Sequence, residues 1–304
     1  MIEYFGQIFV LFGINVILAS SLNVINGYCG LFSLGHAGFF AVGAYSSAAF
    51  TTLIAPEWTA QSPHLALLVS SLIAMGTAGI AGLAVGIPCL RLTGDYLAIA
   101  TVGFGEIIRI VFLNMDVVGA SRGMPGIPRL TTIPWVIVGA AFTLIILNNL
   151  IKSSFGRCIK SIREDEIAAQ AMGVNVRFYK TFSFVVGSLF AGLAGSLFAH
   201  NQEFLHPSNF VFMISVSVLL MIVLGGLGSQ KGAVLGAFIV TLLPELLRLN
   251  EFVSQIRMLV FGLIMILVML VFPEGLLGLL KKGSLKNKFF KKAKNEPGFS
   301  GAPL

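Results

Sequence analysis

The sequence predicts an all-α, polytopic integral membrane protein with about nine transmembrane helices, within a range of roughly eight to ten. Composition carries this prediction, because 56% of the 304 residues are hydrophobic and only 11% are charged. An ordinary soluble domain has about 25% charged residues. Windows of about 20 residues recur with almost no ionisable side chain, which is the length that a helix needs to cross a bilayer.

The expected spans follow one another closely along the chain. They cover residues 5–25, 27–50, 64–90, 92–114, 133–151, 182–200, 210–227, 233–247 and 258–272. Glycines recur through the second of these, which predicts a closely packed or interrupted helix near the centre of the protein. We expect residues 1–280 to form one transmembrane domain. The basic and then Pro/Gly-rich tail, 281–304, is expected to be disordered.

The basic residues predict how the chain is oriented. With nine crossings, most of the 20 lysines and arginines fall on the side that holds residues 155–180 and the tail. Arg122, Arg129, Arg248 and Arg257 fall on the opposite side. Lys and Arg are enriched on the cytoplasmic side of membrane proteins, so the N-terminus is expected outside and the C-terminus in the cytoplasm. Orientation also explains the net charge of +7 better than nucleic-acid binding does.

A long charged, amphipathic stretch lies between the apolar segments at residues 155–180. Its acidic and basic residues are followed by alanines at helix-favouring spacing, and Gly173 supplies a helix stop. One interpretation is a helix of about three turns that presents acidic and apolar groups to a partner protein. The other is a solvated loop that its basic charge holds in the cytoplasm.

No pattern in the sequence indicates covalent chemistry. It contains no GxxxxGK[ST] phosphate loop, no HExxH and no CxxC. Cys29, Cys89 and Cys158 are far apart and lack metal-ligand spacing. We therefore expect no enzyme activity, no catalytic residue, no metal site and no cofactor bound by this chain.

Three of the ionisable residues inside predicted spans have two interpretations each. His36 lies in the Gly-rich second segment, where helix packing is favoured over a place in a transport path. Glu106 and Arg109 are three residues apart, so they share a helix face and can neutralise each other. This pair is either a structural ion pair or a gating element.

Several blocks of sequence, in the same order, are similar to one known family. They are GYCGLFSLGHAGFFAVGAY at 27–45, TGDYLAIATVGFGEIIRIV at 93–111, FGRCIKSIREDEIAAQAMGVNVRFYK at 155–180, GLAGSLFA at 192–199, VLGGLGSQKGAVLGA at 223–237 and FPEGLLG at 272–278. The chain resembles the permeases of high-affinity branched-chain amino acid ABC importers, and among them the M-type subunits of the Liv system. The family ending usually reads Arg-Pro-Gln-Gly, so Phe272 and Glu274 depart from it.

The resemblance implies that residues 155–180 contain a cytoplasmic coupling helix, which docks into a groove of a separate ATPase. The residues expected to couple to that ATPase are Arg163, Glu164, Asp165, Glu166, Ala168, Ala169 and Gly173. Ile167 interrupts the family's EAA-type pattern. The residues expected along the translocation path are Ser33, Gly35, His36 and Gly38.

The resemblance also implies the rest of the assembly. The permease domain would lie in a bacterial inner membrane and work by alternating access. Its partners would be a homologous H-type permease, two ABC ATPase subunits that bind ATP, and a periplasmic or lipid-anchored binding protein. The cargo could be Leu, Ile and Val, a broader set of amino acids, or an amide such as urea. The alternative functions are an ion-coupled secondary transporter with Glu106, Arg109 and His36 as a relay, and a polytopic membrane enzyme.

Overall fold

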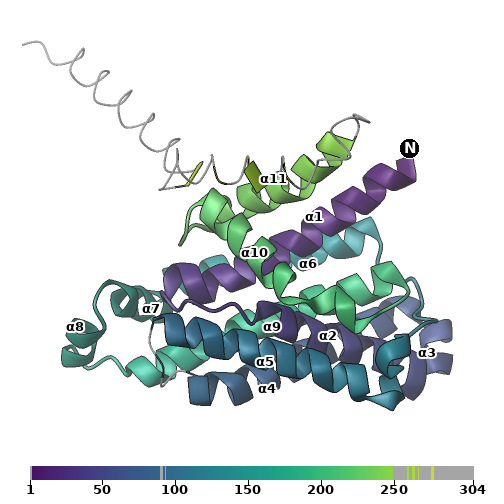
Figure 1. Cartoon of the computed structure of the whole chain (residues 1–304), viewed down its shortest axis with the longest axis horizontal. Helices are drawn as coiled ribbons and strands as arrows, with labels where there is room; N and C mark the ends of the chain where they lie inside the picture. The colour runs from purple at the N-terminus through teal and green to yellow at the C-terminus, as the bar shows by residue number, and fades with distance from the viewer. Residues whose placement is uncertain are drawn as a thin grey trace, which may run out of the picture.

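The computed structural model describes residues 2–89, 92 and 94–248, together with the isolated positions 259, 262, 263, 266, 275 and 276. These residues form helices joined by short connections (Figure 1). The helices are α1 Ile2–Leu22, η1 Asn23–Tyr28, α2 His36–Ala49, η2 Phe50–Ile54, α3 Pro56–Gln61, α4 Pro63–Cys89, α5 Asp95–Asn114, η3 Asp116–Val118, η4 Ala120–Arg122, α6 Ile133–Lys152, α7 Ser154–Glu164, α8 Glu166–Ala171, α9 Val176–Gln202, η5 Pro207–Phe210, α10 Phe212–Gly225 and α11 Gln230–Arg248.

Eight of the described helices, some of them continued by a π-helix or 3₁₀ turn, are long and apolar enough to cross a membrane. The prediction of an all-α protein with roughly eight to ten spans is therefore confirmed. The predicted span 258–272 lies outside the described residues, apart from four isolated positions, and so does the tail 281–304.

The second predicted span has the wrong boundaries. The sequence places one interrupted helix over residues 27–50, but Gly27 and Tyr28 complete the first span as the end of the π-helix η1. A non-helical connection follows, in which Gly30 has a φ of +73°, a left-handed conformation that glycine adopts without a steric penalty. The second span then begins at His36 and continues through η2 to Ile54.

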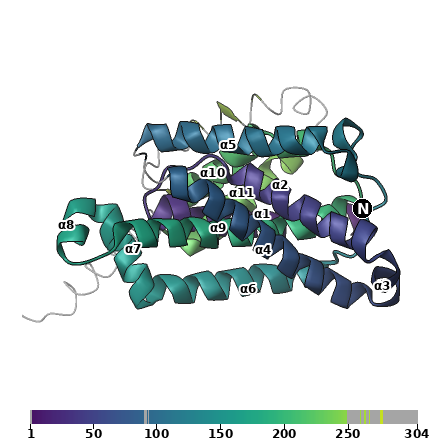
Figure 2. The same ribbon diagram turned by 90° about the horizontal axis from the view of Figure 1, so that it is seen from below.

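Helix α9 lies at the centre of the bundle and packs against α1, α2 and α4. Figure 2 shows α5 and α6 along opposite edges, with the central helices between them. The close approach of α2 to α9 requires glycine, because a Cβ atom at Gly43 would clash with the backbone of Gly192. Small residues at such contacts bring helix backbones together in membrane proteins, where van der Waals packing drives association.

The spans alternate in direction, so the two ends of the bundle carry different parts of the chain. In both views the N-terminus lies at one end, and α7 and α8 lie at the other (Figures 1 and 2). Backbone hydrogen bonds between Met124 and Leu205 join two loops at the N-terminal end. The multi-pass architecture is clear, and the side that faces the cytoplasm stays a prediction.

Candidate functional site

The predicted coupling segment forms two helices, so the prediction of a single helix of three turns is wrong. α7 ends at Glu164, and Asp165 has an extended backbone with φ −156° and ψ 113°. The Asp165 carboxylate then accepts hydrogen bonds from the backbone N–H groups of Ile167 (2.9 Å) and Ala168 (3.0 Å). This N-cap stabilises the start of α8 as a separate helix. Beyond α8, Gly173 has a φ of +81°, as predicted for a helix stop.

The short helix α8 projects from the bundle with apolar side chains exposed. Ile167 and Met172 are 80% and 84% exposed, among the most exposed large apolar side chains of the described residues. Ala169 instead turns inward and is buried against Ile162 of α7 and Val176 of α9. Of the two predicted alanines, Ala169 therefore anchors α8 to α7 and α9, and Ala168 lies on the exposed surface.

An ion pair connects α8 to the first turns of α9. The Glu166 carboxylate lies 2.6 Å from Nζ of Lys180. The Lys180 side chain is only 9% exposed, whereas that of Glu166 is 47% exposed. A buried ammonium group without a partner is strongly destabilising, so Glu166 satisfies Lys180 and fixes the position of α8 at the same time.

Arg163 connects α7 to the end of the first membrane span. Its Nη1 donates a hydrogen bond of 2.6 Å to the carbonyl oxygen of Gly27, in η1. Glu164, next along α7, is exposed. A Cβ atom at Gly228 would lie close to the same guanidinium group. Arg163 therefore lies where the coupling segment meets two glycine-rich breaks of the membrane helices.

These two breaks are also bonded to each other. The backbone N–H of Gly228 donates to Oδ1 of Asn23 (2.9 Å), and the N–H of Gln230 donates to the Tyr28 hydroxyl (3.1 Å). Asn23 and Tyr28 are the first and last residues of η1. The end of the first span, the turn before α11 and the coupling segment thus form one junction. π-Helices are frequent at functional sites.

A cavity of about 300 Å³ opens beside this junction. Its lining includes Phe32, Leu97, Arg163, Glu166 and Cys29. Burial raises the pKa of the Cys29 thiol to about 11, so this cysteine is a neutral thiol and a poor nucleophile near pH 7. Among the described residues, no group of three or more His, Cys, Asp or Glu side chains is placed to hold a metal ion.

The residues predicted for the translocation path lie inside the subunit. Ser33 and His36 are buried, and Nε2 of His36 lies 2.8 Å from the Ser21 hydroxyl. Gly35 packs against the backbone of Thr101, and Gly38 packs against Gly105, so both bring α2 close to α5. This arrangement favours the packing interpretation of His36. A role of these four residues in transport stays a prediction.

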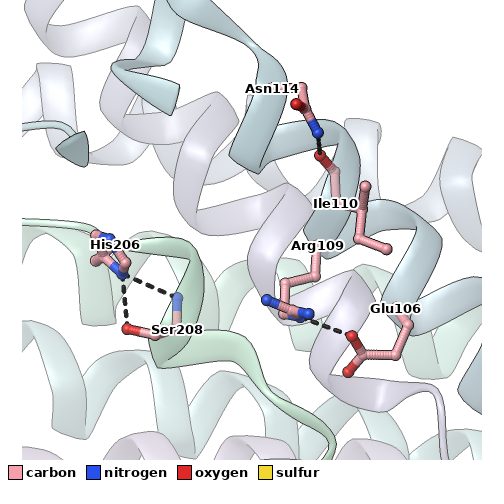
Figure 3. A network of polar contacts seen from close by, with 6 residues as sticks. All are labelled: Glu106, Arg109, Ile110, Asn114, His206 and Ser208. Carbon is pink, nitrogen blue, oxygen red and sulfur yellow. Dashed lines mark hydrogen bonds and ion pairs between the residues drawn. The ribbon is translucent and has the colours of Figure 1, made fainter. Parts of the chain in front are cut away.

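Glu106 and Arg109 form the ion pair that their spacing predicts. Nε of Arg109 lies 2.7 Å from Oε2 of Glu106, with the two side chains turned toward each other on α5 (Figure 3). Their side chains are 35% and 26% exposed, respectively. One turn further along α5, the Asn114 amide donates to the carbonyl oxygen of Ile110 (2.8 Å). The pair thus lies at the side of an outer helix.

With this geometry in place, comparison with known proteins identifies the family. A family model described as "Branched-chain amino acid transport system / permease component" matches residues 4–269. The chain belongs to the branched-chain amino acid transport permease family. The matched region contains α7, α8 and every described span, apart from Glu3 at the start of the first span.

Individual relatives of this permease are of two types. The high-affinity branched-chain amino acid transport system permease protein LivM of Escherichia coli (strain K12) is 34% identical over 90% of this chain and 72% of the relative. The probable LivM protein of Methanocaldococcus jannaschii is 24% identical over 91% of this chain and 94% of the relative. The LivH permease of Escherichia coli (strain K12) is 29% identical over 55% of this chain and 54% of the relative. No solved structure matches the permease.

Several residues at the junction and on α8 were not predicted as functional from the sequence. Ile167 reads as an interruption of the coupling pattern, whereas the structure places it at the exposed tip of α8 together with Met172. Two large apolar residues in a charged stretch were the available signal. The contacts of Asn23 and Tyr28 join residues about 200 positions apart in sequence, and no local pattern announces such contacts.

Proposed function

We propose that this chain is the M-type permease subunit of an ATP-driven importer of branched-chain amino acids. In this proposal the chain itself has no enzyme activity, and ATP binds to separate ATPase subunits. The names of its relatives support branched-chain amino acids as cargo over urea or another amide. The presence of LivH relatives in the same family supports an H-type permease as its partner in the membrane.

The observation that carries the coupling proposal is the exposed apolar tip of α8. Ile167 and Met172 would each lose contact with water on docking, and burying such a side chain stabilises an interface by about 1.5–3 kcal/mol. A helix laid into an apolar groove is a common recognition mode. We infer that α8 inserts into a groove of the ATPase. Movement of that ATPase then reaches the membrane helices through α7.

The contacts of Arg163 supply a route for that movement. When α7 shifts, the Arg163 guanidinium pulls on the Gly27 carbonyl oxygen, its hydrogen-bond partner. Because η1 is bonded to the turn before α11, the first and the last described spans would respond together. In this proposal the α7–α8 end faces the cytoplasm, the N-terminus faces outward, and a periplasmic or lipid-anchored protein delivers the amino acid.

The test is to place a charge on the tip of α8. In the variants Ile167→Asp and Met172→Asp, we expect recovery of the ATPase in co-purification to fall about tenfold or more, because each places a carboxylate in the docking groove. ATP-driven leucine uptake into proteoliposomes that also contain the other subunits and the binding protein should fall with it. The matched control is Val117→Asp, since Val117 is 71% exposed at the opposite end of the bundle.

Two outcomes would contradict the proposal. If Ile167→Asp and Met172→Asp recover as much ATPase as Val117→Asp does, α8 is not the docking helix. If the wild-type chain purifies alone and takes up leucine on an ion gradient without ATP, the chain is an ion-coupled secondary transporter.

A further inference from the structure

The ion pair of α5 occupies an unusual place in the membrane. Among the described residues, Glu106 and Arg109 are the only Asp, Glu, Lys or Arg side chains in the middle half of a candidate span. Arg109 turns toward Glu106, deeper into the span, with Nε 2.7 Å from Oε2. An arginine near a membrane surface usually extends toward the headgroups instead. Both charges are therefore held near mid-depth.

Exposure of these two charges to lipid would be energetically unfavourable. Helix α5 lies at an edge of the bundle (Figure 2), and both side chains keep part of their surface exposed. A charge at the centre of a bilayer is costly, so such residues face a protein interior or a water-filled path. The described part of the chain leaves 35% of the Glu106 side chain and 26% of the Arg109 side chain uncovered, so we infer that the assembled transporter or its cargo covers these parts.

The exposed surface beside the pair is apolar and open. Ile99, Ile107 and Ile110 are 69%, 55% and 48% exposed and line the outer face of α5 with Gly103. A Cβ atom at Gly103 would meet no other atom within 4 Å. Glycine weakens a helix interior by about 1 kcal/mol relative to alanine, and no contact within the described residues explains it here. Gly103 leaves space for a group that approaches α5 from outside.

We propose that Glu106 and Arg109 bind the zwitterionic backbone of the transported amino acid. This inference rests on the proposed function, because it assigns the substrate class to a site. In the empty path the two side chains neutralise each other. When the amino acid arrives, its α-ammonium group pairs with Glu106 and its α-carboxylate pairs with Arg109. Its branched side chain contacts Ile107 and Ile110.

This exchange balances charge at every stage. The empty site holds one cation and one anion, and the loaded site holds two of each, so no net charge enters the membrane. One ion pair is replaced by two, and the Arg109 guanidinium can engage a carboxylate through two parallel hydrogen bonds. A cargo that lacks either charged group would leave a partner unsatisfied in a low-dielectric setting, and this disfavours it.

The decisive variant is Glu106→Gln/Arg109→Gln in the complete transporter. Removing both charges together leaves no unpaired ion, and replacing a whole ion pair by neutral groups is often harmless to stability. We expect normal recovery of all subunits and normal basal ATP hydrolysis. The maximal rate of ATP-driven leucine uptake should fall about 10- to 100-fold, because two charge-assisted contacts to the cargo are lost. Asn114→Ala, at the next polar side chain along α5, is the matched control and should transport normally.

A second measurement uses the wild-type transporter and no variant. Photo-leucine, a diazirine analogue that keeps both charged groups, is irradiated with the complex in lipid nanodiscs, and the labelled peptides are identified by mass spectrometry. We expect label on residues 96–110, suppressed by excess leucine but not by leucinol, which lacks the carboxylate. Label elsewhere only, or equal suppression by leucinol, would overturn the proposal.

The uptake assay separates the two levels of inference. Wild-type rates in the double glutamine variant would make the pair purely structural and would overturn the binding site alone. A wild-type transporter that imports no leucine with ATP would instead overturn the proposed function. If the double variant does not assemble, the photo-leucine result decides.

Discussion

Helices α5 and α9 have the same mean hydropathy, 1.8 over their most apolar windows, yet 78% of that window is buried in α9 and only 17% in α5. The glycines of the two helices differ in the contacts that they make with neighbouring helices. Gly192 and Gly195 of α9 are in backbone contact with α2, whereas Gly103 of α5 meets nothing. Hydropathy therefore identifies both helices as membrane spans without telling which one is central. Gly105 of α5 does pack against α2, so the difference is that α9 packs against several helices, whereas α5 keeps an open face at Gly103.

The largest expected effect is on the central helix. Gly192→Leu would drive a side chain into the backbone of Ala74 and the Cβ atom of Ala78 on α4. Neither group can move aside as a flexible side chain would. We therefore expect the variant to be destabilised by about 3 kcal/mol or more, the upper end of the range typical of overpacking. Membrane abundance should fall close to zero.

Gly103→Leu on α5 is the matched substitution for that experiment. The same side chain meets open space there, so abundance should stay unchanged, and the apparent unfolding temperature of the isolated chain should stay the same or rise slightly because leucine favours a helix more than glycine does. Equal loss of abundance in the two variants would mean that the contrast between the helices is not one of packing space.

A smaller effect is expected where α9 carries charge. Lys180 lies in the first turns of α9, and its partner is Glu166. Glu166→Ala should lower stability by about 1.5–3 kcal/mol, because it leaves the buried ammonium group unpaired. The apparent unfolding temperature in detergent reports this change. The double variant Glu166→Ala/Lys180→Met should recover most of it, and a double variant as unstable as the single one would argue against the ion pair.

The smallest effect concerns the hydroxyl groups inside α9. The Ser196 hydroxyl lies 2.7 Å from that of Ser47 and 3.0 Å from that of Ser71. Ser196→Ala should lower stability by about 1 kcal/mol, the usual net value of such bonds. Asn114→Ala on α5 removes a hydrogen bond that is exposed and should change stability by less than about 0.5 kcal/mol. If thermal unfolding shows a larger loss of stability for Asn114→Ala than for Ser196→Ala, the proposed difference between α9 and α5 is wrong.

Much of the fold could be predicted from the sequence, because a membrane span can be recognised from one continuous apolar stretch of about 20 residues. The ion pair of Glu106 and Arg109 also follows from local spacing on one helix face. The break at Asp165 had a signal as well, since Asp is a preferred N-cap, but the surrounding acidic residues and alanines favour a continuous helix equally. The helix and N-cap preferences of the individual residues do not decide between one continuous helix and two helices separated at Asp165.

The path and the junction lay beyond sequence reasoning for a different reason. Ser33 and His36 are polar residues in a glycine-rich segment, and such residues either face a path or satisfy each other inside the bundle. His36 is next to Ser21, which belongs to another span. Arg163 meets Gly27 across 136 positions of sequence. Only the tertiary arrangement reveals these partners.

The glycine contacts of the bundle have a mechanical consequence. Gly43 and Gly195 place the backbones of α2 and α9 against each other, and Gly192 does the same for α4. Backbone against backbone leaves no side chain that could rotate to absorb a displacement, so we expect these three helices to move as one unit. Backbone contacts of the same kind join α2 to α5 at Gly38 and Gly105, and α10 to α11 at Gly225 and Gly232, so we expect α5 to follow the central helices and α10 to move together with α11. We therefore expect a transport cycle in this chain to move packed groups of helices rather than single helices.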